Sequence, residues 1–279
     1  MPNTTYSIHC NMKIVSNIFS ATATLVLGTA INTPMEARTE EASAHAGSLG
    51  IATPLKISQG PIVFFGASTS ALREGTKTFS ENVQDYSTAN HWDASFINAG
   101  VPGNTTVMAK KRFQRDVLDH SPSYVIIMFG INDSMVDTWE QPTATGPRVP
   151  LDVYLENLQY FVREIRSHGG EAILLTPQRL SWTPKLRELY GTTPYDPNDP
   201  DGLNSILDTY AAAVRKLSEK EKIPLVDIHQ AWMKFPDETG ESASELLLDG
   251  MHPNDRGHQV ISNLLIEKLL SLREKKDAG

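Results

Sequence analysis

Five short apolar runs, separated by segments with helical periodicity, are the feature that most constrains the fold of this chain. The runs are Ile62–Phe65, Ser95–Ile97, Tyr124–Phe129, Ala172–Leu175 and Leu225–Ile228. Each has the length and composition of a strand buried on both faces. Apolar residues recur every three or four positions in Val107–Leu118, Leu151–Ile165, Leu203–Leu217 and Val260–Leu272. Strands that alternate with helices pair in parallel, so the sequence predicts an α/β fold: a three-layer α/β/α sandwich with a five-stranded parallel sheet.

The composition excludes several classes of protein. The 279 residues are 40% hydrophobic, which is sufficient for the core of a soluble domain. The formal charge of −8 and the absence of a dominant basic patch argue against a nucleic-acid partner. The only cysteine is Cys10. If the segment around it is removed by processing, the mature domain has no disulfide, no thiolate metal site and no cysteine nucleophile.

The N-terminal region has the pattern of a secretory signal peptide. Lys13 precedes an apolar stretch from Ile14 to Leu27, and small residues at positions 28–30 offer a cleavage site. We therefore expect residues 1–31 to be a signal peptide, with Met12 as the initiator and a secreted or periplasmic product. An uncleaved membrane anchor is the alternative. Its apolar run is short and interrupted by serine, asparagine and threonine, which disfavours a stable membrane span in the mature form.

The remaining chain divides into a linker and one domain. Residues 32–59 are rich in alanine, threonine, glutamate, serine and glycine without periodicity, which is typical of a flexible linker. The five apolar runs all follow, so we expect a single domain over residues 60–275. Ligands of open α/β sheets bind beyond the carboxyl ends of the strands. The residues directly after each run are therefore the candidates for a functional site.

The first strand end carries a serine. Gly66-Ala67-Ser68 allows a sharp turn, and we expect Ser68 to lie where the next helix begins, with its backbone N–H free to face an anion. A serine that only caps a helix is the structural alternative. The segment is not the G-x-S-x-G nucleophile elbow, because Ser70 stands where the last glycine should be.

The second and third strand ends carry possible oxyanion donors. Gly103 follows the second strand and could present its N–H without obstruction by a side chain. Asn132 follows the third strand and could add a side-chain N–H. Each is also explained as an ordinary turn or Asx-turn residue.

A candidate base and its orienting carboxylate are found in the segment Asp249-Gly250-Met251-His252-Pro253. An aspartate three residues before a histidine can hold one imidazole nitrogen, so that the other faces outward as a base. A lone motif of this kind is more often a turn, but here it joins a serine and two donors at one predicted edge. Asp227 and His229 form a rival pair, for which a structural role in the loop is the better interpretation.

Four blocks of the chain together resemble the SGNH (GDSL-like) hydrolase superfamily over residues 61–270. The matching blocks are Gly66–Ser68, Gly100–Asn104, Gly130–Asp133 and Asp249–Pro253. The resemblance implies a flavodoxin-like fold and ester hydrolysis without metal or cofactor.

The same resemblance implies a role for each candidate residue. Ser68 is the nucleophile, His252 the base and Asp249 the residue that orients it. The N–H groups of Ser68 and Gly103 and the amide of Asn132 form the oxyanion hole.

The sequence departs from the family pattern at Ala67, where these proteins usually have aspartate. This aspartate is a supporting residue, so we expect activity to survive.

Secretion, acidity and the aromatic residues of the long segment Pro177–Gly202 favour a serine esterase that removes acetyl groups from carbohydrate, with this segment as one wall of the pocket. The alternatives are a lipase, thioesterase or acyltransferase of the same superfamily, or a non-catalytic carbohydrate-binding relative.

Overall fold

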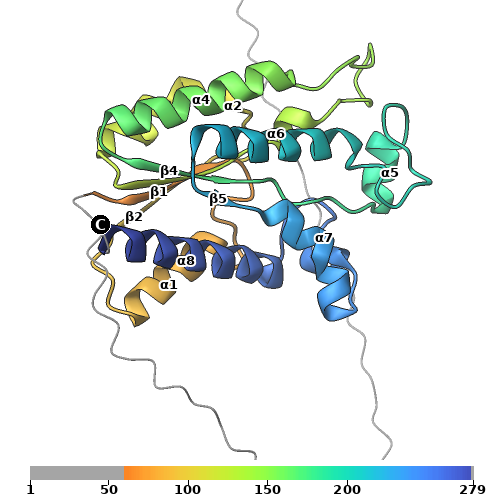
Figure 1. The fold of residues 1–279 in the computed structure, drawn as a ribbon. Helices are drawn as coiled ribbons and strands as arrows, with labels where there is room; N and C mark the ends of the chain where they lie inside the picture. The colour runs from red at the N-terminus through yellow and green to blue at the C-terminus, as the bar shows by residue number, and fades with distance from the viewer. Residues whose placement is uncertain (1–59, 278–279) are drawn as a thin grey trace, which may run out of the picture. The chain divides into compact units, whose positions relative to one another are not determined.

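The computed structural model of this chain describes residues 60–277 and contains one parallel sheet (Figure 1). The strand order is β2-β1-β3-β4-β5, which is the flavodoxin-like order. All neighbouring strands are parallel. The strands are β1 Ile62–Gly66, β2 Phe96–Gly100, β3 Tyr124–Met128, β4 Glu171–Leu175 and β5 Leu225–Val226. The predicted signal peptide (1–31) and linker (32–59) lie outside the described residues.

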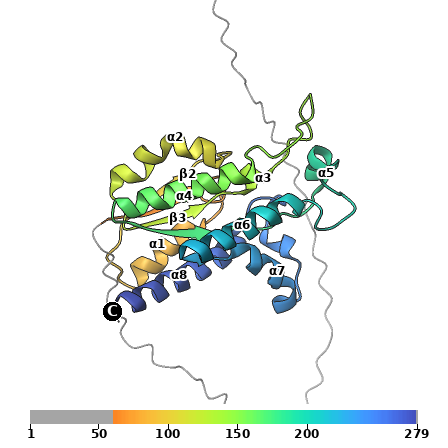
Figure 2. The same cartoon turned by 45° about the horizontal axis from the view of Figure 1, so that its top comes forward.

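Helices cover both faces of the sheet, which confirms the predicted three-layer α/β/α sandwich (Figures 1 and 2). One layer contains α2 (Thr106–Asp116), α4 (Leu151–Ser167) and α6 (Ser205–Glu221). The opposite layer contains α1 (Phe79–Ala89), α7 (Ile228–Thr239) and α8 (Asp255–Asp277). Among residues 60–277, no helix combines the length and the apolar content needed to cross a membrane.

Alternating side chains of the strands fill the two spaces between sheet and helices. In β1, Val63 and Phe65 enter the core beneath α2, α4 and α6, whereas Ile62 and Phe64 enter the core beneath α1, α7 and α8. All five β1 residues are buried, as expected of a central parallel strand. The two cores fix the strands, and the strands in turn fix the loops at their carboxyl ends.

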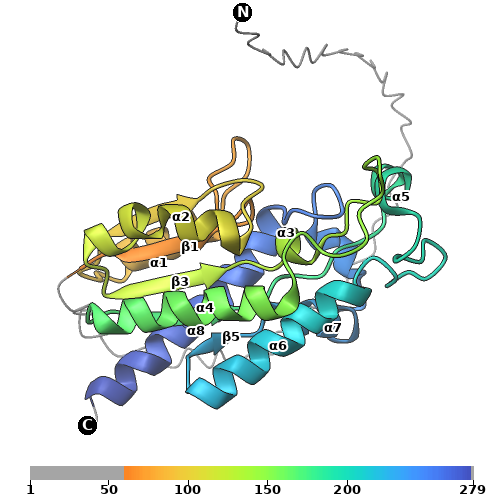
Figure 3. The ribbon, with the colours of Figure 1, turned by 90° about the horizontal axis from the view of Figure 1, so that it is seen from above.

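Shorter elements gather at the carboxyl edge of the sheet. Two short helices, α3 (Ile131–Ser134) and α5 (Pro184–Tyr190), lie at this end of the molecule (Figure 3). The 3₁₀ turn η2 (Ala243–Leu246) precedes the loop that leads into α8, whereas the other such turn, η1 (Leu118–His120), lies between α2 and the amino end of β3. A third apolar cluster packs the loop after α3 against the segment that carries α5.

Two local expectations were wrong. No helix begins at Ser68, because α1 starts only at Phe79. The fifth strand ends at Val226 and does not reach Ile228, because the Asp227 side chain accepts the Gln230 N–H and caps α7. Ile228 is the first residue of α7, so its backbone is helical and cannot belong to the strand.

Candidate active site

The segment after β1 forms a tight turn that presents Ser68. The Ala67 carbonyl accepts hydrogen bonds from the Ser70 N–H (3.2 Å) and the Ala71 N–H (3.0 Å), so the chain makes one turn that does not continue as a helix. Gly100 of the neighbouring strand permits this turn. A Cβ at position 100 would lie 2.3 Å from the Ala71 nitrogen, so only glycine fits there.

The loop between η2 and α8 brings a histidine to Ser68. His252 Nε2 lies 3.0 Å from Ser68 Oγ, and His252 Nδ1 lies 2.8 Å from Asp249 Oδ2. The other Asp249 oxygen accepts the N–H groups of Met251 (3.0 Å) and His252 (2.8 Å). The structure therefore brings the three residues of the predicted triad into one hydrogen-bonded chain, although Ser68 and His252 are 184 positions apart.

The surroundings of Asp249 keep its carboxylate ionised. Partial burial opposes the charge, but hydrogen bonds from the His252 ring and from the His252 and Met251 N–H groups outweigh it. The pKa of Asp249 therefore lies well below its ordinary value. An ionised carboxylate at Nδ1 favours the tautomer with its proton on Nδ1, which leaves the Nε2 lone pair facing Ser68.

The predicted oxyanion donors lie on two linked segments. Asn132 belongs to α3, and its Nδ2 donates one hydrogen bond to the Asn104 carbonyl (3.0 Å). Gly103, which precedes Asn104, has φ +77°. Within residues 60–277, the backbone N–H groups of Ser68 and Gly103 donate no hydrogen bond. Both N–H groups therefore remain available to another acceptor.

Asp133 explains why these two segments meet. Its Oδ1 accepts both the N–H (2.7 Å) and the hydroxyl (2.6 Å) of Thr106, the first residue of α2. The carboxyl is fully buried, and this burial raises the pKa of Asp133. The contact holds α3 against the start of α2, and so holds Asn132 against the turn that carries Gly103.

Gln178, which the sequence argument missed, ties the nucleophile turn to the histidine loop. Its Nε2 donates to Thr69 Oγ1 (3.1 Å) and to the Met251 carbonyl (2.9 Å), and its side chain is completely buried. Gln178 lies three positions after the end of β4. Applying the same strand-end rule to β4 would have identified it. Ser181 N–H also bonds to the Gly250 carbonyl (2.8 Å), so the segment after β4 contacts the site directly.

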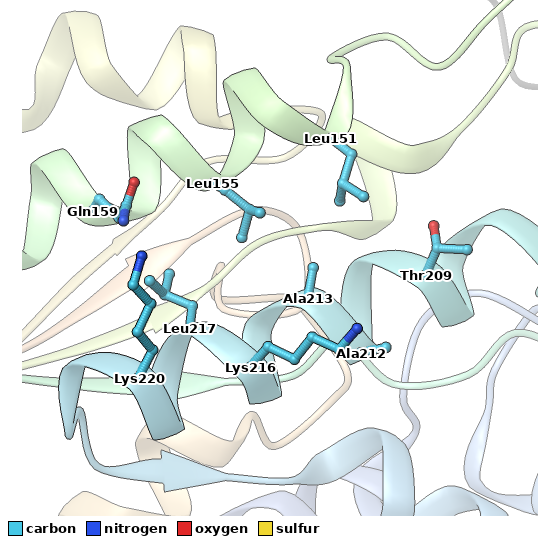
Figure 4. A pocket seen from close by; sticks show the side chains of 9 residues that line it. All are labelled: Leu151, Leu155, Gln159, Thr209, Ala212, Ala213, Lys216, Leu217 and Lys220. Carbon is cyan, nitrogen blue, oxygen red and sulfur yellow. The ribbon is translucent and has the colours of Figure 1, made fainter.

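A small cavity opens beside Ser68. Its volume is about 20 Å³. It is lined by Ala67, Ser68, Thr69, Met128, Phe129, Gly130, Ile131, Asn132, Pro177 and Gln178. A larger cavity of about 570 Å³ lies between α4 and α6, where Leu155 and Leu217 face each other (Figure 4). The two cavities share no lining residue, so the small one is the cavity that belongs to the Ser68 site.

The rival Asp227/His229 pair forms a structural network. His229 Nε2 lies 2.8 Å from Asp208 Oδ1, and its Nδ1 accepts from Arg215 (3.0 Å). Asp227 pairs with the same arginine at 2.6 Å. Both imidazole nitrogens are occupied and the ring is buried, so His229 is not available as a base.

Comparison with known proteins agrees with this architecture. Residues 64–260 match the GDSL-like Lipase/Acylhydrolase family. The chain is 30% identical to the uncharacterized lipoprotein YqeF of Bacillus subtilis over 223 residues, which cover 72% of this chain and 85% of that protein. It is 27% identical to an acetylxylan esterase of Geobacillus stearothermophilus, over 62% of this chain and 71% of the esterase. An isoamyl acetate-hydrolyzing esterase of Saccharomyces cerevisiae is 25% identical, over 61% of this chain and 67% of the yeast protein.

Solved structures share the fold. The acetylxylan esterase Axe2 of Geobacillus stearothermophilus superposes with a TM-score of 0.59 at 22% identity, covering 76% of this chain and 94% of Axe2. LAE5, an α/β hydrolase enzyme from the metagenome of Lake Arreo, gives a TM-score of 0.60 at 25% identity, covering 78% of this chain and 97% of LAE5. The chain belongs to the GDSL-like lipase/acylhydrolase family, the SGNH hydrolases, and is a carboxylic ester hydrolase.

Proposed function

We propose that this protein is a serine esterase that hydrolyses acetyl and other short-chain esters through an acyl-enzyme. The observation that carries the proposal is the hydrogen-bonded chain from Ser68 Oγ through His252 to Asp249, with distances of 3.0 and 2.8 Å. These are the distances that a nucleophile needs to its base, and a base to the group that orients it.

The reaction has two stages. His252 Nε2 takes the proton from Ser68 as Oγ bonds to the ester carbonyl carbon, and the carbonyl oxygen becomes an oxyanion. The N–H groups of Ser68 and Gly103 and the Asn132 amide stabilise that charge. The intermediate collapses when its bond to the alcohol oxygen breaks, and the alcohol leaves with the proton from His252. Water then attacks the acyl-enzyme with His252 again as base, which releases the acid and restores Ser68.

The cavity beside Ser68 supports a preference for acetyl. Its volume of about 20 Å³ is small, which favours a short acyl group. A butyryl chain would add two methylene groups to the methyl group of an acetyl ester. Most of the exposed surface that lines it is apolar, as an acyl methyl requires.

For the alcohol part of the substrate we propose a carbohydrate. The similarity to an acetylxylan esterase supports this proposal. The aromatic residues expected to stack on sugars support it less, because Tyr190 and Tyr195 are buried in the third apolar cluster. The ring of Trp182 is paired with the Arg187 guanidinium at 5.2 Å. Trp139, 49% exposed on the loop after α3, is the aromatic side chain at this edge that remains available to a sugar.

The test compares p-nitrophenyl acetate, butyrate and octanoate with acetylated xylan. We expect the highest kcat/KM with the acetate, a fall with chain length, and acetate release from the polysaccharide. Ser68→Ala should abolish turnover of every substrate. Ser70→Ala is the matched control, because this neighbouring hydroxyl is buried and has no hydrogen-bond partner among the described residues.

Each part of the proposal can be contradicted by a separate experimental result. Full activity in Ser68→Ala would remove the nucleophile assignment. Equal rates with acetate and octanoate would contradict the acyl pocket. Release of acetate from p-nitrophenyl acetate but not from acetylated xylan would contradict the carbohydrate substrate. Binding of the polysaccharide by a wild-type protein that turns over no ester would favour the non-catalytic relative, and transfer of acetyl to added alcohol in preference to water would favour an acyltransferase.

We also propose that the enzyme is exported, on the basis of the signal-peptide pattern in residues 1–31. The lipoprotein status of the relative YqeF is consistent with a location outside the cytoplasm. N-terminal sequencing of protein recovered outside the cytoplasm should give a start near position 31. A product found only inside the cytoplasm with residues 12–31 attached would contradict export.

A further inference from the structure

Arg148 holds the side-chain amide of Asn132 from the side opposite Asn104. Arg148 Nη1 donates to Asn132 Oδ1 (3.3 Å), while Asn132 Nδ2 donates to the Asn104 carbonyl (3.0 Å). The carbonyl end and one of the two N–H groups of this amide are therefore occupied. The second N–H group is left for a substrate oxygen.

The guanidinium is itself fixed. Asp137 accepts two hydrogen bonds from Arg148, from Nε (2.7 Å) and from Nη2 (2.6 Å), in the bidentate geometry that suits a planar guanidinium. The Arg148 side chain is 30% exposed and that of Asp137 is 11% exposed, so the pair is shielded from much of the solvent.

The backbone places Arg148 beside α3 independently of its side chain. Its N–H bonds to the Met135 carbonyl (2.9 Å), and the next N–H, of Val149, bonds to the Asp133 carbonyl (3.0 Å). These bonds close the loop after α3 onto its own start. Replacing the Arg148 side chain therefore leaves these backbone bonds in place, while it removes a hydrogen-bond partner from Asn132 and the ion-pair partner from Asp137.

We infer that Arg148 is a positioning residue for the oxyanion hole: together with Asp137 it fixes the Asn132 amide with its N–H group toward the reacting carbonyl. A flipped amide would set N–H groups against the guanidinium and oxygen against the Asn104 carbonyl, and neither pair can hydrogen-bond. The cation also polarises the amide, which strengthens its remaining N–H as a donor. This inference rests on the proposed function, because it assigns a partner to one of its oxyanion donors.

The experiment is a double-mutant cycle on p-nitrophenyl acetate. The variants are Arg148→Met, Asn132→Ala, the double variant and Arg148→Lys. Loss of a whole oxyanion donor lowers kcat by about 10²- to 10³-fold, and loss of a residue that only positions the donor should lower it by about 10-fold. We therefore expect Arg148→Met to lower kcat by about 10-fold with KM and the pH profile unchanged. Arg148→Lys should recover part of the loss, because lysine can still donate to Asn132 Oδ1. In the Asn132→Ala background, Arg148→Met should have no further effect.

Arg163→Met is the matched control, because Arg163 lies on the exposed surface of α4 and, among the described residues, pairs with neighbours on the same helix. Thermal unfolding of each variant shows that it is folded. An unchanged kcat in Arg148→Met would overturn the inference, as would an equal fall in both backgrounds, since the arginine would then act elsewhere. Failure of the proposed function is distinguishable, because it appears as activity that survives Ser68→Ala.

Discussion

At the scale of the residue, the turn that carries Ser68 is supported without the aspartate that the family usually has at position 67. Arg112, on α2, provides that support through its guanidinium group. Its guanidinium donates to the carbonyls of Gly66 (3.0 Å) and Ala99 (2.7 Å), and its Nε donates to Asn104 Oδ1 (2.8 Å). One buried cation therefore links the ends of β1 and β2 to the turn that carries Gly103. None of these contacts involves the side chain at position 67.

The carboxylate of Asp249 is expected to matter through the tautomer of His252. Asparagine at position 249 would offer an N–H to Nδ1, so that the proton moves to Nε2 and the base toward Ser68 is lost. We predict that Asp249→Asn lowers kcat by about 10⁴-fold, by analogy with the same change in other triads. Steady-state kinetics on p-nitrophenyl acetate at pH 7 measure this.

The control for Asp249→Asn is Asp237→Asn. It removes one negative charge from an exposed side chain of α7, which lies away from the site. Its rate should match that of the wild type. If Asp249→Asn loses less than about 10-fold, the assignment of Asp249 as the orienting residue is wrong.

At the scale of the element, the first turns of α1 and α8 are joined by His258. Its Nδ1 accepts the N–H of Phe79 (3.2 Å), the first residue of α1, and its ring stacks on that of Phe79 with centroids 6.1 Å apart. Burial, with a further contribution from Arg73, lowers the pKa of His258 to about 4. The imidazole is therefore neutral in the folded protein and accepts the hydrogen bond.

This depressed pKa predicts a loss of stability in weak acid. In the unfolded chain His258 binds a proton below a pH of about 6.5, whereas in the folded protein it does so only below about pH 4. The unfolded state is thus favoured increasingly as the pH falls through that window, by up to ~3 kcal/mol. Above the window the full stability is present.

Chemical denaturation of the wild type and of His258→Asn between pH 7.5 and 4 checks this. The asparagine can still accept the Phe79 N–H but has no proton to bind. We expect the variant to be less stable at pH 7.5 and to show a flatter pH dependence. The exposed His120→Asn should follow the wild type. Parallel curves for the wild type and His258→Asn would show that His258 is not the source of the pH dependence.

The sequence predicted the five strands and the helices α2, α4, α6 and α8. The predicted helical segments Val107–Leu118 and Val260–Leu272 correspond to α2 (Thr106–Asp116) and to part of α8 (Asp255–Asp277). The helices α1 and α7 were not predicted. The N-terminus of α7 was taken for strand, because Leu225–Ile228 is a continuous apolar run except for Asp227.

At the scale of the whole molecule, the parallel sheet brings to one edge residues that are far apart in the sequence. The strand-end rule pointed to Ser68 and Asn132, which follow β1 and β3, whereas His252 was proposed from the motif that begins at Asp249. It could not find Arg148, whose role depends on a loop folding back upon its own start. Contacts of this kind follow from tertiary packing and have no local sequence signal.

The central claim is that Ser68 is the nucleophile in the hydrogen-bonded chain formed with His252 and Asp249. Its most direct test is covalent capture by an organophosphate such as diisopropyl fluorophosphate, followed by mass spectrometry of proteolytic peptides. We predict one adduct per chain, located on Ser68, formed in step with loss of esterase activity and absent from Ser68→Ala. Inactivation with the adduct on another residue, or unchanged labelling of Ser68→Ala, would contradict the account.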